Sequence, residues 1–426
     1  MSDFADLLFQ RAEQAYAREQ FVEAEGLLRM LLGRSSREAH VTFLLGHLRL
    51  RQGDPTEAEA LLRSAIELDG TQARAHDDLG VALAALGRHA EARELRLRGM
   101  ELDPEIARQR IVKSFDALRK ADFATGWEEY ESRIVASPGV LPRRGFAQRQ
   151  WYGDTDIAGK SILLHAEQGH GDAIQFLRYV PMVAALGARV VLEVHRPLVP
   201  LAAAIPGVAE LHPLGYPLPP FDLHSPLMSL PLAFATDLAT IPAEIPYLSV
   251  PPERMALWRR RVGPRRRMRI GIVWSGNPDY GDDHKRSIPL ADFTRILDRP
   301  ECELHVIQND VRAGDKPVLD GLTHLSDHST LFGDFADTAA LISLLDLVIA
   351  VDTSVAHLAG ALGWPTWLLL PHLADWRWLT DREDSPWYPT MWLFRQETEG
   401  DWAGVLDRVA QQLTLLLAQA HDPDAA

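Results

Sequence analysis

The sequence predicts an α-solenoid followed by two facing, doubly wound Rossmann-like α/β domains. Three observations predict this class: a repeat of 34 residues near the start, alternating strand and helix patterns afterwards, and a complete strand–helix–strand unit at residues 348–370. The length of 426 residues allows two or three domains. A content of 46% hydrophobic and 24% charged residues is typical of a globular protein.

Small residues recur at the same interval in the N-terminal part. Leu45-Gly46 returns as Leu79-Gly80, 34 residues later. The same interval separates Ala24, Ala58 and Ala92. Helix pairs of this period cannot bury their apolar faces alone, so they stack into a curved solenoid with a concave groove. We therefore expect a repeat domain over residues 1–135 and, from its Pro, Gly and basic content, a linker over residues 136–152.

Two halves of α/β pattern follow, expected at residues 153–255 and 256–426. In the first half, strands at 161–166 and 189–194 flank a helix at 172–186, whereas residues 197–252 are assigned only loosely. The second half is expected to contain a strand, a helix, a strand and a helix. The strand–helix–strand unit at residues 348–370, called the crossover unit below, and a last amphipathic helix follow. Apart from the crossover unit, these lie at residues 269–274, 290–297, 303–308, 338–345 and 402–417. Two such halves favour a ligand cleft between them.

The crossover unit reads VIAVDTSVAHLAGALGWPTWLLL, and its first apolar run ends in Asp352-Thr353-Ser354. Thr353 and Ser354 can cap the helix that follows, whose free N–H groups and dipole favour an anion such as a pyrophosphate. In a parallel sheet, ligands bind beyond the carboxyl ends of the strands. The structural alternative is a capped helix in which Asp352 only forms the turn.

A second candidate site follows the first strand of the first α/β half, at Gly169-His170-Gly171-Asp172. The glycines permit a tight turn and leave room for a ligand, but the spacing is not that of the dinucleotide fingerprint, because Ile174 stands where its third glycine belongs. The carboxylate of Asp172 can accept a proton from an attacking hydroxyl. The alternative is that Asp172 merely caps the helix.

Charge and cysteine content exclude several function classes. A formal net charge of -15 argues against a nucleic-acid binder. The single cysteine, Cys302, excludes an intramolecular disulfide and a multi-cysteine metal site. Asp282-Asp283-His284 is interpreted as a solvated loop rather than a set of metal ligands, so no metal is expected. Neither a signal-peptide pattern nor a spanning apolar run is present in the sequence, so we expect a cytoplasmic protein.

Four segments in order carry a family resemblance: QGHGDAIQFLRYVP, WSGNPDYGDDHKRSIPLADF, FADTAALISLLDLVIAVDTSVAHLAGALGWP and DWRWLTDREDSPWYPT. Together with the repeats, which resemble tetratricopeptide repeats, they are similar to bacterial tetratricopeptide-repeat glycosyltransferases. Their catalytic part resembles the heptosyltransferase-like family of the GT-B fold. The likeness covers nearly the whole chain.

The resemblance implies roles for individual residues. Asp172 matches the aspartate proposed as catalytic base. Lys285 and Arg286, the latter the closer fit, match the basic position facing the donor diphosphate. The remaining donor-binding positions are Asn277, Gln308, Asp352, Thr353, Ser354 and His357. Ser354 departs from the family pattern, which usually has glycine there, and this leaves the donor sugar open.

The repeat resemblance also implies residues that line an acceptor groove: His40, Phe43, His47, Arg51, Arg74, Asp77 and Phe115. The alternative for the repeats is a packing platform for the α/β region. Four large rings follow the crossover unit, at Trp376, Trp378, Trp387 and Tyr388. We interpret them as loop packing rather than as a sugar-stacking platform.

The implied activity is that of an inverting, metal-independent, hexosyl- or heptosyltransferase-like enzyme that moves a sugar from a nucleotide-sugar to an acceptor hydroxyl, without a cofactor. Fused repeats favour a protein acceptor, as in flagellin-type O-glycosylation. Two alternatives stay open: transfer onto lipopolysaccharide or another glycan, and a repeat-based adaptor with a degenerate transferase domain. Spacing does not identify the nucleotide, the sugar, the acceptor or the oligomeric state.

Overall fold

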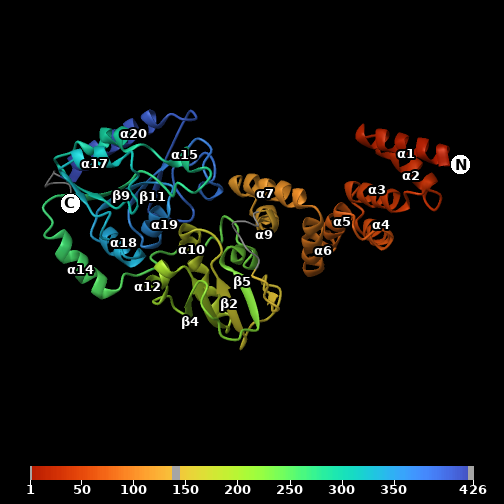
Figure 1. Ribbon diagram of the computed structural model, residues 1–426, viewed down its shortest axis with the longest axis horizontal. Coiled ribbons are helices and arrows are strands. Elements are labelled where there is room, and N and C mark those ends of the chain that lie inside the picture. The colour runs from red at the N-terminus through yellow and green to blue at the C-terminus, as the bar shows by residue number, and fades with distance from the viewer. Residues whose placement is uncertain (1, 137–143, 421–426) are drawn as a thin grey trace. The chain divides into compact units, whose positions relative to one another are not determined.

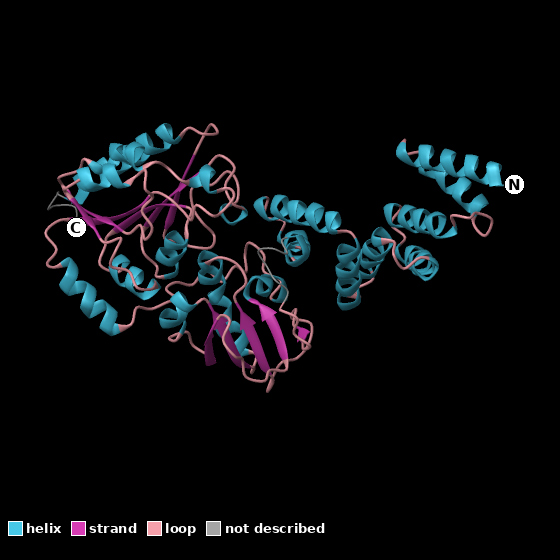
Figure 2. Cartoon of the chain, viewed as in Figure 1, coloured by secondary structure: helices cyan, strands magenta, loops and turns pink. Residues whose placement is uncertain are grey.

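The structure is a computed structural model that describes residues 2–136 and 144–420. The chain forms two compact units, Met1–Ser114 with Glu129–Arg144, and Phe115–Glu128 with Gly145–Ala426. Figure 2 shows only helices and loops in the first unit and confines the strands to the second. Part of the expected linker, residues 137–143, lies outside the described residues.

The first unit is built of antiparallel helix pairs. Its helices are α1 (Ser2–Ala17), α2 (Phe21–Leu31), α3 (Glu38–Arg51), α4 (Pro55–Leu68), α5 (Ala73–Ala85), α6 (His89–Leu102), the larger part of α7 (Pro104–Arg119), the end of α8 (Phe123–Tyr130) and α9 (Arg133–Ala136). A Cβ on Gly46 would lie 2.7 Å from the Leu62 side chain, and one on Gly80 would lie 2.8 Å from the Ala92 carbonyl. The repeated glycines therefore permit close packing within each helix pair, and the 34-residue pattern correctly predicted helical repeats.

The first half of the second unit has a five-stranded sheet in the order β1-β5-β2-β3-β4. Its strands are β1 (Arg149–Gln150), β2 (Ser161–His165), β3 (Arg189–Val194), β4 (Val208–Pro213) and β5 (Leu223–Pro226), and the paired strands are parallel. The connecting helical segments are α10 (His170–Phe176), η1 (Leu177–Tyr179), α11 (Val180–Ala185), η2 (Arg196–Leu198), α12 (Val199–Ala202), η3 (Leu227–Ser229) and α13 (Leu230–Ala233).

The second half has a six-stranded parallel sheet in the order β11-β10-β9-β6-β7-β8. Its strands are β6 (Met268–Val273), β7 (Cys302–Val306), β8 (Leu325–Asp327), β9 (Leu347–Val351), β10 (Thr366–Leu370) and β11 (Met391–Arg395). Its helical segments are α14 (Pro252–Val262), α15 (Asp283–Arg286), α16 (Leu290–Leu297), α17 (Lys316–Gly321), α18 (Phe335–Ile342), α19 (Ser354–Ala361), η4 (Trp376–Trp378) and α20 (Trp402–Ala420).

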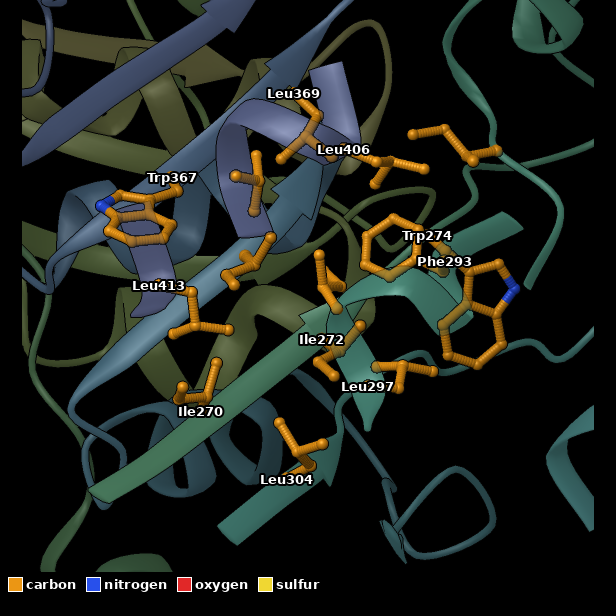
Figure 3. Close-up of a cluster of buried hydrophobic side chains, with 14 of the residues drawn as sticks. Ile270, Ile272, Trp274, Phe293, Leu297, Leu304, Trp367, Leu369, Leu406 and Leu413 are labelled. Carbon is orange, nitrogen blue, oxygen red and sulfur yellow. The ribbon is translucent and has the colours of Figure 1, made fainter. Parts of the chain in front are cut away.

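The two faces of this second sheet are covered by different helices (Figure 1). Alternate residues of β6, Ile270 and Ile272, point to the face covered by α16 and α20, where they meet Phe293, Leu406 and Leu413 (Figure 3). The helices α18 and α19 lie against the other face. Because each half is a parallel sheet with connecting helices, the predicted class of two doubly wound domains after a helical region is confirmed.

Candidate functional site

Both sheets reverse their strand order at one point, and the candidate residues lie at these two points. In the first sheet the chain runs from β2 through β3 to β4 and then returns to add β5 on the other side of β2. In the second sheet it runs from β6 through β7 to β8 and then adds β9 beside β6. Ligands of open α/β sheets bind at such switch points, beyond the carboxyl ends of the strands. The topology therefore marks the segments after β2, β6 and β9.

Asp172 lies in the first turn of α10, the helix that follows β2. Its Oδ2 accepts a hydrogen bond of 3.0 Å from the Gly169 N–H, so Asp172 does cap its helix. Its Oδ1 forms an ion pair of 2.5 Å with Nη2 of Arg377, a residue of the second half. Asp172 thus does more than cap its helix, because its other oxygen is held by the opposite half.

The helix α19 begins directly after β9 and packs against α10 (Figure 1). A Cβ on Gly171 would lie 2.9 Å from Cδ2 of His357 and 3.3 Å from Cα of Ser354. Because carbon atoms pack at about 3.5–4.0 Å, only a glycine permits this approach without a shift. The structure therefore brings Gly171, the neighbour of Asp172, to the candidates Ser354 and His357 on α19.

Asp352 occupies the carboxyl end of β9. Its Oδ2 accepts a hydrogen bond of 2.8 Å from the Trp378 indole, and its carbonyl accepts one of 2.8 Å from Nη1 of Arg286. His357, one turn into α19, lies 3.9 Å from Oδ1 of Asp352 and shares a hydrogen bond of 2.9 Å with the Tyr388 hydroxyl. Arg286, Trp378 and Tyr388, from two other parts of the sequence, thus meet Asp352 and His357 here.

The expected side-chain cap of α19 is wrong. Thr353 stands at the N-cap position, but its side chain makes no capping hydrogen bond. Its buried Oγ1 has no hydrogen-bond partner among the described residues, and the same holds for Oγ of Ser275, which follows β6. Buried hydroxyls are normally hydrogen-bonded, so two orphaned ones at one switch point are consistent with a polar ligand there.

Of the two basic candidates, Arg286 faces the β9–α19 turn and Lys285 does not. Lys285 pairs with Asp282 at 2.6 Å and its side chain is 52% exposed. Arg286 donates to the Asp352 carbonyl and, at 3.1 Å, to Oδ1 of Asp283. Arg286 is therefore the residue placed to meet an anion at the α19 N-terminus.

The interpretation of Asp282-Asp283-His284 as a solvated loop is wrong for Asp283, which is 3% exposed. Its carboxylate binds Arg286, Arg312 and the Ser287 hydroxyl. Two guanidinium groups on one carboxylate leave this group of three side chains with a net positive charge. Among the described residues, no group of three or more His, Cys, Asp or Glu side chains is arranged to hold a metal ion.

Two further donor candidates have structural contacts. Gln308 follows β7, as predicted, but its amide is used within the protein: Nε2 donates to the carbonyls of Ser275 and Asp310, and Oε1 accepts from the Trp274 and Ser275 N–H groups. It therefore braces the segment after β6. Asn277 is exposed, and its Oδ1 accepts a hydrogen bond of 3.0 Å from the Asp279 N–H.

Burial sets the protonation states at this site. It raises the pKa of the Asp352 carboxyl to about 6, and the nearby Asp375 carboxylate acts in the same direction. Burial also raises the pKa of Asp172, although Arg377 opposes the rise, so this carboxylate is a stronger base than an exposed one. The pKa of His357 is held well below its usual range by burial and by neighbouring cations, so His357 is neutral near pH 7.

The large rings of the segment after β10 are packed inside the protein, as expected. Trp376, Trp378, Trp387 and Tyr388 are each at most 2% exposed. The Trp127 ring, from the earlier α8, meets Trp376 at 5.3 Å between ring centroids, and its indole N–H donates to the Thr236 carbonyl at 2.8 Å. These rings position the loop that carries Arg377.

In the first unit, the expected groove residues of α3 form a row of rings. The His40 ring lies 5.5 Å from Phe9 and 5.8 Å from Phe43, and His47 follows at 6.2 Å from Phe43. Phe43 itself is only 8% exposed, so packing uses most of its surface.

The remaining members of that set differ in their exposure and in their partners. Arg74 is exposed, Arg51 stacks over the Phe21 ring at 5.5 Å, and Asp77 pairs with Arg110 at 2.6 Å. His47 pairs with Asp78 at 2.6 Å. Phe115 belongs to the second compact unit and is 36% exposed. Whether these residues bind an acceptor stays a prediction.

Sequence reasoning missed Arg377, Arg312 and the contact of Tyr388 with His357. Arg377 lies in the DWRW segment that carried part of the resemblance, but its partner Asp172 is 205 residues earlier. The available signal was a charged residue between two tryptophans, because an arginine flanked by buried rings needs an internal partner.

Residues 49–112 match the tetratricopeptide repeat family. Over 425 residues the chain is 25% identical to Protein FlbA of Caulobacter vibrioides, spanning 92% of this chain and 70% of that protein.

Two solved structures are similar to part of this chain. One is a glycosyl transferase family 9 protein from Veillonella parvula, with 11% identity, a TM-score of 0.46, and coverage of 63% of this chain and 99% of that chain. The other is the E. coli ADP-heptose lps heptosyltransferase II, with 14% identity, a TM-score of 0.43, and coverage of 62% and 100%. The tetratricopeptide repeat match thus lies ahead of an α/β region of two doubly wound domains.

Proposed function

We propose that the protein is an inverting, metal-independent glycosyltransferase that moves a sugar from a nucleotide-sugar donor to an acceptor hydroxyl. One observation carries the proposal. Gly171, the neighbour of Asp172 at the switch point of the first sheet, lies against Ser354 and His357 at the switch point of the second, and Arg377 of the second half binds Asp172 itself. A base and an anion-binding turn are then on opposite halves of one site, as transfer between two bound substrates requires.

On the donor side, a nucleoside diphosphate leaves with growing negative charge. The N–H groups at the start of α19 favour an anion, and Arg286 lies 2.8 Å from the Asp352 carbonyl at the same turn. The unpartnered hydroxyls of Thr353 and Ser275 add hydrogen-bonding capacity there. These groups can stabilise the diphosphate without a metal, which supports the metal-independent form of the proposal.

On the acceptor side, the carboxylate of Asp172 accepts the proton of the acceptor hydroxyl. The hydroxyl oxygen forms a bond to the anomeric carbon while the bond from that carbon to the diphosphate oxygen breaks. Attack from the face opposite the leaving group inverts the configuration. The raised pKa of Asp172 favours this step, because a general base works best when its pKa approaches the working pH.

The acceptor in this proposal is a protein bound by the repeats and modified on Ser or Thr hydroxyls, as in flagellin-type O-glycosylation. The row of His40, Phe43 and His47 and the exposed Arg51 and Arg74 support a peptide-binding role. The cytoplasm stays the proposed compartment. Within the described residues, no helix is both long and apolar enough to cross a membrane.

The test begins with purified protein and a panel of nucleoside diphosphates and nucleotide-sugars in a thermal-shift screen, because tight ligands raise the melting temperature. The donor selected in this way is then incubated with candidate acceptor proteins and glycans, and products are identified by intact mass. Transfer to protein supports the full proposal, and transfer to a glycan alone contradicts the protein acceptor. Absence of binding and turnover across the panel supports an adaptor with a degenerate transferase domain.

A truncation separates the two roles of the chain. Because Phe123 and Trp127 pack within the second unit, the deletion should stop before α7, removing residues 1–103. We expect this variant to keep donor binding and to lose transfer to protein. Equal loss of both activities would count against acceptor binding by the repeats.

A further inference from the structure

Arg377 is a buried cation at the junction of the two α/β halves, and the chemistry proposed above does not use it. It is 6% exposed and lies in η4 of the second half. Its Nη2 binds Oδ1 of Asp172 at 2.5 Å, and its Nε donates to Oε1 of Gln175. Both partners lie on α10 of the first half, so one guanidinium spans the junction.

The geometry of these contacts fixes the carboxylate of Asp172. Asp172 and Gln175 are three residues apart on α10 and therefore share one helix face. The planar guanidinium presents its N–H groups in a rigid fork, so binding both side chains sets the position of the fork relative to the helix. With Gly169 N–H on Oδ2 and Arg377 on Oδ1, each oxygen keeps lone-pair capacity for a hydroxyl.

The charges around Asp172 come from few groups. Arg377 lowers its pKa, and Asp375, which binds Nη1 of Arg377 at 3.0 Å, raises it. His357, on the packed helix α19, is neutral near pH 7 because burial keeps its pKa well below its usual range. Among the described residues, Arg377 is thus the cation with the largest effect on this carboxylate, and its removal leaves the like charge of Asp375 nearby.

We propose that Arg377 is a positioning residue, which holds the Asp172 carboxylate in the orientation for accepting a proton and does so from the opposite half of the site. The Asp172 carboxylate then has this orientation only while α10 and the loop carrying Arg377 are in contact. The inference rests on the proposed function, because it assigns a partner to the base of that reaction.

The experiment compares Arg377→Met, Arg377→Lys and a matched control, Arg178→Met, in the full chain. Arg178 is also buried, at 4% exposed, and also joins the halves, donating to the Trp387 carbonyl at 2.8 Å, but it does not contact Asp172. For each variant, kcat and donor KM are measured against pH together with the melting temperature. The donor is the nucleotide-sugar selected in the binding screen.

We expect Arg377→Met to lower kcat by about a hundredfold, as for a misplaced reacting group, with donor KM nearly unchanged. The acid limb of its pH profile should move up by about one unit or more, because the opposite charge beside the carboxylate is gone. Arg377→Lys keeps the positive charge but lacks the rigid N–H fork of the guanidinium. The acid limb of its pH profile should therefore stay near the wild-type position, while its kcat stays low. Arg178→Met should lower the melting temperature without moving the limb.

Two outcomes overturn the inference and are distinguishable. If the wild-type protein turns over no donor, the proposed function fails and the inference fails with it. If the wild-type protein is active and Arg377→Met shows an unmoved acid limb, or loses activity only in proportion to its melting temperature as Arg178→Met does, Arg377 is structural and the inference alone fails.

Discussion

Replacing Gly171 with alanine tests the packing that joins the two switch points. The added Cβ would lie 2.9 Å from Cδ2 of His357 and 3.3 Å from Cα of Ser354. Carbon atoms pack at about 3.5–4.0 Å, so the His357 ring or α10 has to move by at least about 0.6 Å.

The His357 ring has little freedom to move. It stacks on Trp378 with 5.4 Å between ring centroids and shares a 2.9 Å hydrogen bond with Tyr388. The second contact is with the backbone of α19, which cannot rotate away. We therefore expect α10 to shift and to carry Asp172 with it.

The energetic cost follows from these contacts. Overpacking costs about 1–3 kcal/mol, and the helix propensity of alanine returns up to about 1 kcal/mol. A net loss of about 1–2 kcal/mol lowers the melting temperature by about 2–4 °C per kcal/mol. Misplacement approaching 1 Å at a reacting group costs up to about a hundredfold in rate.

The assay is thermal melting together with the rate of sugar transfer, with Gly321→Ala as control. Gly321 ends α17, is exposed, and has nothing within 4 Å of an added Cβ. The control should behave like the wild-type protein. If Gly171→Ala also melts and turns over like the wild-type protein, the close approach of α10 and α19 is not a requirement of the site.

Two further predictions concern stability. The folded-state pKa of Asp352, about 6, is above its unfolded value, so its contribution to stability is full below about pH 4 and is lost as pH rises through 6. Asp352→Asn, which can still accept from Trp378, should therefore gain stability relative to the wild-type protein between pH 4 and 8, by no more than about 3 kcal/mol, and a flat difference in melting temperature across that range would contradict this. Trp127→Ala should destabilise the second unit by about 3–5 kcal/mol, because the ring is 2% exposed and packs on Trp376 and Trp387, and unchanged denaturant unfolding of that unit would be inconsistent with it.

The regular elements were predictable wherever the sequence pattern is strong. The unit of β9, α19 and β10 follows from two apolar runs around a helical pattern, and α16 lies at the residues expected for it. By contrast, β11 was missed, because its five residues are embedded among loop tryptophans and show no clean alternation.

The sequence predicted which segments meet at the candidate site better than it predicted the contacts between their side chains. His357 lies near Asp352 and against Gly171, the neighbour of Asp172, because parallel sheets gather the carboxyl ends of their strands, whereas the roles of these residues stay a prediction. Arg377 and the buried state of Asp283 were not predictable, because each depends on a partner placed by the tertiary fold. The missing capping hydrogen bond of Thr353 was not predictable either, because a residue type that often caps helices does not always form the capping bond.

The substitution Asp172→Asn tests the central claim most directly. Asparagine keeps an oxygen for Arg377 but cannot act as the base, so the rate of sugar transfer should fall by about 10²–10⁴-fold. Donor affinity, measured by calorimetry on the same protein, should stay that of the wild type. A variant that transfers sugar at the wild-type rate would show that this carboxylate is not the base and that the two switch points do not form one catalytic site.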